Sequence, residues 1–255
     1  MKIPSLRKPG AEAAPEQPAR RDFLRSGAAL ATLTLAPGVT LMAFGGSETR
    51  GAADAGKRWG LLIDAGKCAD DCTACISACE DENGWKSGHD PERDAQWIRK
   101  VTLKDKATGR ETSLPVMCQH CEEPPCVDVC PTGASFKRKD GIVLVDKHIC
   151  IGCRYCMMAC PFKARSFVHE RVNNQKTNAP RGIGTVESCT LCVHRVDEGR
   201  IPACVEACDA TGYGAMTFGD LNDPESEISK RLKDYPSLAL RPDLDLNPGV
   251  RYAEI

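Results

Sequence analysis

The chain has 255 residues, enough for one large domain or two small ones. Its formal net charge is −1, so overall charge favours neither a nucleic acid nor an acidic membrane surface as its partner. Aromatic residues make up only 5% of the chain, whereas 16 residues are cysteine. This composition predicts a core that is held together by more than the packing of large side chains.

The N-terminal residues 1–45 have the features of an export signal. Arg20 and Arg21 precede an uncharged stretch, residues 26–47, that is rich in Ala, Gly and Thr. An arginine pair in this position is typical of the twin-arginine signal, which carries folded proteins out of the cytoplasm. We therefore expect a periplasmic protein with a linker at residues 46–57. A retained transmembrane anchor and a buried helix are the alternatives.

Short strands and hairpins are expected between the cysteines. Residues 59–64, WGLLID, predict a strand that leads into a cysteine loop. Residues 97–118 predict a hairpin with a polar tip near Gly109, and residues 136–146 predict another that turns at Gly141. Short helices are expected to follow one cysteine in each part of the chain: Cys75, Cys126, Cys156 and Cys204.

The cysteines fall into four groups of four, and each group ends with the spacing C-x3-C. The groups are Cys68, Cys72, Cys75 and Cys79; Cys118, Cys121, Cys126 and Cys130; Cys150, Cys153, Cys156 and Cys160; and Cys189, Cys192, Cys204 and Cys208. A recurring spacing of this kind indicates an internal repeat. The second and third groups are followed by proline and the other two are not, so the groups form two pairs with different local turns.

Disulfides, zinc sites and iron–sulfur clusters all use cysteine in such numbers. Disulfides require a defined separation and orientation of two Cα atoms, which cysteines two or three residues apart rarely reach. Zinc sites usually combine two C-x2-C pairs from separate hairpins, and the second and third groups are too dense for that. A [4Fe–4S] cluster needs one thiolate on each iron, and a C-x2-C-x2-C loop surrounds three of them. Iron–sulfur clusters are favoured, and a zinc-stabilised structural protein is the alternative from another class.

The last cysteine of the third group is expected to serve a second cluster. Cys160 comes four residues after Cys156, which is about one turn of helix, or roughly 6 Å. In ferredoxins with two clusters, the fourth cysteine of such a run binds the neighbouring cluster. Groups must then work in pairs, and the proline pattern favours the second with the third and the first with the fourth. The sequence thus predicts an inner ferredoxin-like unit inserted into an outer one.

Residues outside the cysteine groups give weaker signals. Asp223, followed by a proline and two glutamates, predicts the start of a helix with Asp223 as its N-cap. His120 stands between two cysteines, but with a complete set of thiols it is expected to pack beside a cluster. Four cations flank the inner groups and are expected either to offset the negative charge of a cluster or to be solvated: Lys137, Arg138, Lys163 and Arg165.

These motifs resemble the four-cluster ferredoxin subunits of membrane respiratory complexes, such as those of dimethyl sulfoxide, polysulfide and formate oxidoreductases. CQHCEEPPCVDVCP, residues 118–131, is typical of their second group. CIGCRYCMMACPFKARSF, residues 150–167, is typical of the third, and CTLCVHRVDEGRIPACVEAC, residues 189–208, of the fourth. The resemblance covers about residues 58–220. It implies an α+β fold of two ferredoxin-like units, each with two [4Fe–4S] clusters.

The resemblance implies four crossed ligand sets. They are site A, with Cys68, Cys72, Cys75 and Cys208; site B, with Cys189, Cys192, Cys204 and Cys79; site C, with Cys118, Cys121, Cys126 and Cys160; and site D, with Cys150, Cys153, Cys156 and Cys130. The outer unit is then residues 58–115 and 175–220, and the inner unit is residues 116–174. The first gap of the first group is x3 where the family usually has x2, so a [3Fe–4S] cluster is the alternative at site A.

The family implies that this chain is an electron-transfer subunit without catalytic residues. Such a subunit relays single electrons between a membrane quinone-reactive subunit and a periplasmic redox partner. KRWGLLID, WIRKV and the tail at residues 221–255 most resemble the periplasmic subunit of the sulfite-reductase-linked membrane complex of dissimilatory sulfur metabolism. That implies an NrfD-type polytopic subunit, a periplasmic multihaem cytochrome c and further membrane-complex subunits as partners, with residues 221–255 as a docking tail. A solvated tail is one alternative. The subunit of a molybdoenzyme, nitrite or hydrogenase complex is another.

Overall fold

The computed structural model describes residues 34–36, 39–40, 53–86, 90, 93–173 and 175–255. The chain divides into two compact units, Met1–Thr49 and Arg50–Ile255. In the first unit, strand β1 (Thr34–Ala36) pairs antiparallel with β2 (Val39–Thr40). The arginine pair of the predicted export signal lies outside the described residues, so the signal stays a prediction.

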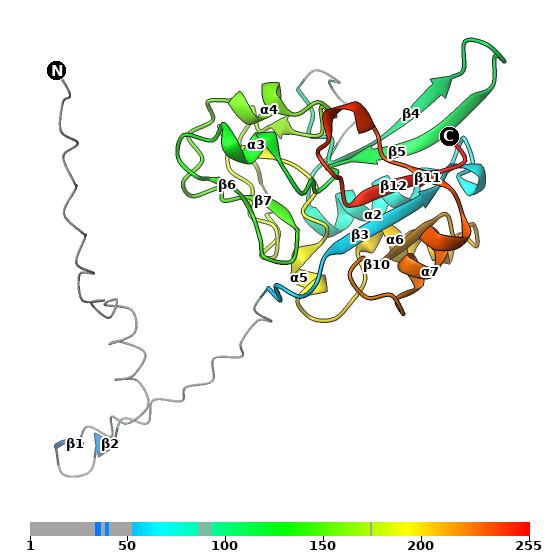
Figure 1. The fold of residues 1–255 in the computed structure, drawn as a ribbon. Helices are drawn as coiled ribbons and strands as arrows, with labels where there is room; N and C mark the ends of the chain where they lie inside the picture. Colours follow the sequence, from blue (N-terminus) through cyan, green and yellow to red (C-terminus); the bar gives the residue numbers. More distant parts are fainter. Residues whose placement is uncertain (1–33, 37–38, 41–52, 87–89, 91–92, 174) are drawn as a thin grey trace, which may run out of the picture. The chain divides into compact units, whose positions relative to one another are not determined.

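A four-stranded sheet is the centre of the second unit, in the order β10-β3-β12-β11 (Figure 1). Its strands are β3 (Trp59–Asp64), β10 (Met216–Asp220), β11 (Ser237–Leu238) and β12 (Val250–Ala253). Strand β3 confirms the strand predicted ahead of the first cysteine group. It runs antiparallel to β10 and parallel to β12, so segments from both ends of this unit lie side by side. Residues 60–63 of β3 are buried, which places the strand inside the core.

The C-terminal residues 221–255 are built into this sheet rather than appended to it. Val250 and Tyr252 of β12 are 1% and 0% exposed. The Tyr252 hydroxyl donates to the carbonyl oxygen of Pro115 over 3.2 Å and accepts from Nε2 of Gln119 over 3.1 Å. The last strand therefore holds the backbone that leads into the second cysteine group. The segment also contains the short 3-10 helix η2 (Pro242–Leu244).

Helix α7 (Glu227–Asp234) begins later than the sequence predicts. Its N-cap is Ser226, whose hydroxyl accepts from the amide of Ser229 over 3.3 Å. The carboxylate of Asp223 accepts instead from the amide of Glu225 over 2.9 Å, in a turn that precedes the helix. The prediction of Asp223 as N-cap was therefore wrong, because that side chain is used by a local turn.

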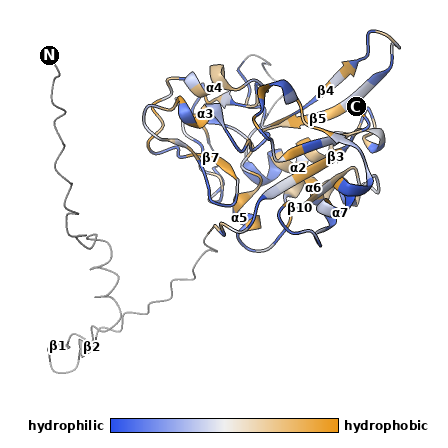
Figure 2. Ribbon diagram, in the orientation of Figure 1, coloured by the Kyte–Doolittle hydropathy of each residue, from blue (hydrophilic) through white to orange (hydrophobic). Residues whose placement is uncertain are grey.

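Both predicted hairpins are confirmed. Strands β4 (Ile98–Lys104) and β5 (Glu111–Met117) pair antiparallel, with Gly109 at the tip in the left-handed region at φ +72°. Strands β6 (Ser135–Lys137) and β7 (Val143–Val145) pair through a turn that contains Gly141 at φ +86°. Figure 2 shows the tip of the β4–β5 hairpin as hydrophilic. A third pair, β8 (Ser166–Phe167) with β9 (Val186–Glu187), was not predicted, because two residues carry no readable alternation.

Short helices surround the cysteines, and the four predicted ones are present. The helical segments are η1 (Ala65–Lys67), α2 (Ala74–Asn83), α3 (Pro125–Asp128), α4 (Tyr155–Ala159), α5 (Val193–Val196) and α6 (Ala203–Ala210). In the part of the chain that the structure describes, no helix is long and apolar enough to cross a membrane. The result is a mixed fold of short helices and strands, in agreement with the predicted class at that level.

Cysteine itself forms much of the core. Eleven of the sixteen thiols are buried. The main core cluster combines Trp85, Trp97 and Tyr252 with thiols from all four cysteine groups, and a smaller cluster combines Cys126 and Cys156 with two valines. Thiol side chains are small and make few van der Waals contacts. Packing of thiols alone therefore stabilises these short helices and strands only weakly. The low aromatic content of the sequence therefore corresponds to a core in which a few aromatic side chains pack among many thiols.

Candidate metal centres

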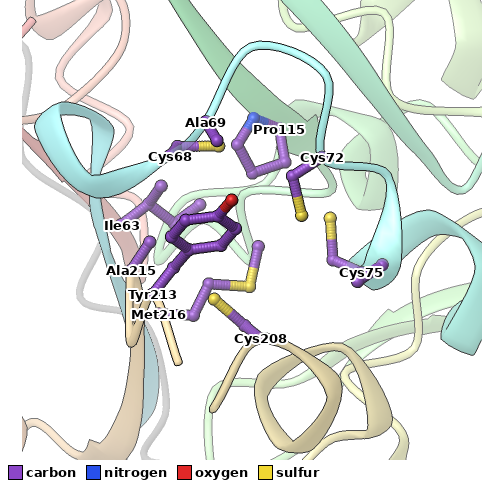
Figure 3. A pocket seen from close by; sticks show the side chains of 11 residues that line it. Ile63, Cys68, Ala69, Cys72, Cys75, Pro115, Cys208, Tyr213, Ala215 and Met216 are labelled. Carbon is purple, nitrogen blue, oxygen red and sulfur yellow. The ribbon is translucent and has the colours of Figure 1, made fainter. Parts of the chain in front are cut away.

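The four thiols of site A line one cavity, although one of them is more than 130 residues away along the chain. Cys68, Cys72 and Cys75 come from the segment that enters α2, and Cys208 comes from α6. The cavity has about 350 Å³ of empty space and is otherwise lined mainly by apolar groups. Figure 3 shows the four sulfur atoms facing this space. Burial, and after it the charges of the other three thiols of the site, raise the pKa of Cys75 to about 12.

A hydrogen-bonded turn absorbs the extra residue in the first gap of site A. The amide of Cys72 donates to the carbonyl oxygen of Ala69 over 3.1 Å, which closes the turn between Cys68 and Cys72. The ammonium of Lys100, on β4, donates to the carbonyl oxygens of both Ala69 and Cys72. Burial raises the pKa of Cys68, and Lys100 acts against that rise. The longer gap therefore still leaves Cys68 in the lining of the cavity.

Site B brings Cys79 of α2 together with three buried thiols from the fourth group. Burial raises the pKa of Cys189 and of Cys204 well above the usual range. For both thiols, the charge of Cys79 contributes to the rise, and Cys192 contributes to that of Cys204. The site is fully enclosed, since all four of its cysteines are buried.

Neutral donors point at one sulfur atom of site B. The indole Nε1 of Trp85 donates to Sγ of Cys79 over 3.2 Å, and Nδ2 of Asn83 approaches the same atom at 3.5 Å. Burial raises the pKa of Cys79 to about 12 in spite of these two hydrogen bonds. The sequence analysis did not identify these donors, because Trp85 follows Cys79 at a distance that no motif marks.

Site C resembles site A in form. Its four thiols line a cavity of about 300 Å³, together with Phe162, Arg165 and three prolines, Pro124, Pro125 and Pro161. All four thiols are buried. Burial, and after it the charges of the other three thiols of the site, raise the pKa of Cys121 to about 12. A set of buried thiols that repel one another as thiolates requires compensating positive charge, which iron supplies when it binds.

Site D lies nearer the surface. Burial raises the pKa of Cys156, Arg165 acts against that rise, and the charges of the Cys150 and Cys130 thiols add to it. The amide of Val186 donates to Sγ of Cys150 over 3.5 Å. Cys153, between them in the chain, is the one exposed cysteine of the sixteen.

Backbone hydrogen bonds favour the thiolate at Cys130. Burial acts to raise the pKa of this thiol, but hydrogen bonds from the amide of Ser135 and the hydroxyl of Thr132 lower it by more, so it lies below the usual value. The Ser135 amide lies 3.4 Å from the sulfur atom. Amide donors of this kind are a recurring feature of sulfur ligands in iron–sulfur sites.

Left-handed backbone conformations let the cysteine loops turn tightly. His120, Arg154 and Cys192 all have positive φ, at 43°, 63° and 47°. Gly152, at φ +70°, passes so close to Gly184 that a Cβ atom would lie 2.1 Å from its carbonyl oxygen. Strained residues of this kind persist where the surroundings compensate them, and they concentrate at functional sites. Of these left-handed positions, the sequence alone predicts only Gly152, because glycine is the residue that adopts positive φ without strain.

The donor sets fit clusters better than single ions. Among the described residues, no three His, Cys, Asp or Glu side chains converge on a point that one ion could occupy. A zinc site needs such convergence, with each sulfur about 2.3 Å from the metal. A [4Fe–4S] cluster instead binds each thiolate to a different iron, so its cysteines stand apart around a larger space. Sites A and C offer four thiols around a mostly apolar cavity, which suits this group.

Of the four cations expected to offset cluster charge, one contacts a thiol. Nη2 of Arg165 donates to Sγ of Cys126 over 3.0 Å. Lys137 and Arg138 instead form ion pairs with carboxylates, 2.8 and 2.6 Å away. Lys163 is exposed. The sequence could not separate these cases, because all four lie within a few residues of a cysteine.

His120 packs beside site C, as expected. Its Nδ1 accepts from the amide of Val143 over 3.1 Å, so a neutral ring carries its proton on Nε2. Burial, and after it the nearby charge of Arg165, lower the pKa of His120 to about 3. The ring is therefore neutral at physiological pH.

Comparison with known proteins identifies the family. A family model described as "4Fe-4S dicluster domain" matches residues 111–221. The Hdr-like menaquinol oxidoreductase iron-sulfur subunit 1 of Archaeoglobus fulgidus is 43% identical, over 78% of this chain and 84% of the relative. A tetrathionate reductase subunit of Salmonella typhimurium is 37% identical, over 76% of this chain and 72% of the relative. Protein NrfC of Escherichia coli is 36% identical, over 78% and 84%.

These similarities and the four sets of thiols lead to one assignment. The relatives are aligned over most of their own length as well as most of this chain. The sixteen cysteines are consistent with four [4Fe–4S] clusters, and the chain transfers electrons within a complex of several subunits. The protein therefore belongs to the ferredoxin-type iron–sulfur subunits of respiratory oxidoreductases.

Proposed function

We propose that this chain relays single electrons through four [4Fe–4S] clusters, between a membrane quinone-reactive subunit and a periplasmic redox partner, in dissimilatory sulfur metabolism. The observation that carries the proposal is the serial arrangement of the four sites. In the proposed ligand sets, one helical turn links sites A and B, and the charge of a thiol of one site acts on a thiol of the next between B and C and between C and D. A relay needs such a series, because single electrons hop over short distances between neighbouring centres.

Three contacts support the order of the sites. Helix α2 carries Cys75 of site A and Cys79 of site B one turn apart. Between sites B and C, Cys118 lies close enough to Cys189 for its charge to raise the pKa of that thiol. Between sites C and D, the charge of Cys156 raises the pKa of Cys126 in the same way.

The ligand sets named above for sites A to D are part of the proposal. The shared cavities at sites A and C support them, and so do the neighbouring thiols at sites B and D. At site A, the turn that keeps Cys68 in the cavity lining supports a [4Fe–4S] cluster over a [3Fe–4S] cluster. In this scheme the outer unit, residues 58–115 and 175–220, holds sites A and B. The inner unit, residues 116–174, holds sites C and D.

The residues of this chain position the clusters, shield them and tune them. When bound, each cluster supplies one-electron redox chemistry with little change of geometry. Burial of eleven thiols keeps water away from most of the sulfur ligands. Hydrogen bonds to sulfur and nearby cations set the potentials, which in such proteins range from roughly −700 to +450 mV. No catalytic residue is required for this role.

Exposed apolar residues favour docking at the D end of the series. Cys153 is exposed, and Ile151, Tyr155 and Met158 in the same loop and helix are 66%, 54% and 70% exposed. Large apolar side chains gathered on a surface are typical of protein–protein contacts. Within residues 221–255, Leu238 lies on β11, the edge strand of the four-stranded sheet, and is 58% exposed. This exposed apolar side chain supports a docking role for the tail at the edge of the sheet.

The partners and the location follow from the similarities and the N-terminus. The sequence most resembles the periplasmic subunit DsrO, which favours an NrfD-type membrane subunit, a multihaem cytochrome c and export by the twin-arginine route. A relative named as part of a menaquinol oxidoreductase supports a quinone-linked partner. A relative named as part of a tetrathionate reductase favours the second candidate, the electron-transfer subunit of another respiratory oxidoreductase such as a molybdoenzyme.

Anaerobic affinity purification from native membranes tests the proposal. We expect the chain to carry along a polytopic quinone-type subunit and c-type haem, without molybdenum. A copurifying molybdenum subunit would contradict the sulfur-metabolism assignment and support the second candidate. A preparation that holds zinc instead of iron would contradict the electron relay itself.

A further inference from the structure

Arg165 hydrogen-bonds a ligand of site C directly and is linked to a ligand of site D through Ser135. It is 6% exposed and lines the cavity of site C. Its Nη2 donates to Sγ of Cys126, a site C ligand, over 3.0 Å, and to the hydroxyl of Ser135 over 2.8 Å. Ser135 in turn donates its amide to Sγ of Cys130, a ligand of site D, over 3.4 Å, and Cys126 packs in one small core cluster with Cys156, another ligand of site D. One guanidinium therefore stands between the two inner sites.

The charge of Arg165 is not neutralised by a carboxylate. None of the ion pairs formed by the described residues includes it, and its Nε and Nη1 are buried without a hydrogen-bond partner in the protein. Arg138 and Arg181, by contrast, each pair with a carboxylate within 2.8 Å. An unpaired buried guanidinium is costly unless anions face it. The thiols of Cys126, Cys118 and Cys156 are the groups that meet this charge.

The outer sites have different surroundings. Lys100 hydrogen-bonds the loop of site A alone and acts on Cys68. At site B, Cys79 receives its side-chain hydrogen bonds from the neutral groups of Trp85 and Asn83. A cation shared by two sites is thus a feature of the inner pair.

We propose that Arg165 raises the reduction potentials of the clusters at sites C and D together, and so keeps these two centres close in energy for electron transfer between them. The guanidinium keeps its positive charge in both redox states. When one electron moves from one cluster to its neighbour, no bond or proton is exchanged, and the added negative charge remains beside the same cation. The reduced form of either cluster is stabilised more than its oxidised form, which raises both potentials.

This inference rests on the ligand sets proposed above, and its test separates the two. The intact membrane complex is purified with Arg165→Gln, Arg165→Lys or Ser135→Ala, and an anaerobic redox titration is followed by electron paramagnetic resonance. We expect Arg165→Gln to lower two of the four potentials and leave the other two unchanged. Arg165→Lys, which keeps the charge, is expected to shift the same two by less. The control Lys100→Gln is expected to lower one potential, that of site A.

Several results would overturn the inference. A shift in one potential only, in none, or by equal amounts in all four would show that Arg165 is not a shared cation of sites C and D. Ser135→Ala removes only the hydroxyl that holds the guanidinium, so it decides the matter if Arg165→Gln fails to assemble. We expect it to lower the same two potentials by a smaller amount, and no shift there would also contradict the inference. Iron content is measured in every sample. If the unmodified protein contains about four irons per site, the proposed function stands however the potentials respond. A lower iron content would contradict the proposed function and not the inference about Arg165.

Discussion

The indole Nε1 of Trp85 donates a hydrogen bond to Sγ of Cys79 over 3.2 Å. The ring is 0% exposed, so no water competes for this donor. Cys79 is also the residue through which α2 reaches site B, one helical turn beyond the Cys75 thiol of site A. In the proposed ligand sets, the hydrogen bond therefore acts on the cluster of site B where that site adjoins site A.

Replacing Trp85 by phenylalanine should lower the reduction potential of the site B cluster. The substitution removes the indole donor to Cys79, and hydrogen bonds to cluster sulfurs stabilise the more negative, reduced state. The potentials are measured by redox titration with electron paramagnetic resonance. Trp97→Phe is the matched control, because Trp97 is also buried and its Nε1 has no hydrogen-bond partner among the described residues. Equal shifts in the two variants would contradict this role of Trp85.

Gly152→Ala should remove the cluster at site D. The added methyl group would lie 2.1 Å from the carbonyl oxygen of Gly184, in addition to the strain of a residue at φ +70°. The loop must then move, and with it the cysteines on either side. Iron analysis should show a loss of about four irons per chain, the content of one cluster.

Gly109→Ala controls for the backbone strain alone. Gly109 has nearly the same φ, +72°, but a Cβ atom there meets nothing within 4 Å. We expect a loss of about 1 kcal/mol in the free energy of unfolding, from the left-handed conformation, and full iron content. If Gly152→Ala retained all its iron, the close approach to Gly184 would not be needed for site D.

Tyr252→Phe should destabilise the fold by about 1–3 kcal/mol, the cost of leaving buried polar groups without partners. The hydroxyl donates to the carbonyl oxygen of Pro115, which precedes the second cysteine group, and accepts from the side-chain amide of Gln119, which lies within that group. The midpoint of thermal unfolding, followed by circular dichroism at a fixed scan rate, should fall. Tyr235→Phe, at a side chain 58% exposed, is expected to leave it unchanged. An unchanged midpoint for Tyr252→Phe would mean that β12 does not support that segment.

Removal of iron should unfold most of the second unit. Eleven buried thiols stand in for large side chains in the core, and without metal only the weak packing of these small groups holds the short elements together. Treatment with a chelator and an oxidant should abolish most of the far-ultraviolet circular dichroism, and iron with sulfide under reducing conditions should restore it. A stable spectrum after the iron has gone would show that the polypeptide packs without its clusters.

The sequence predicted the elements whose signal is local. The hairpins at Gly109 and Gly141 were readable because polar turns with glycine separate two apolar runs. The pairing of β12 with β3 could not be predicted, because nothing in a four-residue strand near the C-terminus indicates a partner strand nearly 190 residues earlier. The start of α7 was misplaced because Asp223 and Ser226 are both good caps, and only the fold decides which is used.

The same distinction holds for the sites. The cysteine motifs and the family they resemble implied sets of thiols, and at sites A and C the thiols of one set line a shared cavity. The motifs said nothing of Trp85, whose contact with Cys79 depends on how the chain turns after α2. Arg165 was one of four candidate cations, and its burial against Cys126 is what separates it from the rest. Groups that tune a cluster are set by tertiary contacts, which no spacing rule records.

An anaerobic reductive titration of the purified holoprotein tests the central claim most directly. Four clusters that each accept one electron predict an uptake of about four electrons per chain, accompanied by bleaching of the brown colour. An uptake well below four would mean that one or more of the thiol sets does not hold a redox-active cluster. A colourless protein that accepts no electrons would contradict the relay altogether.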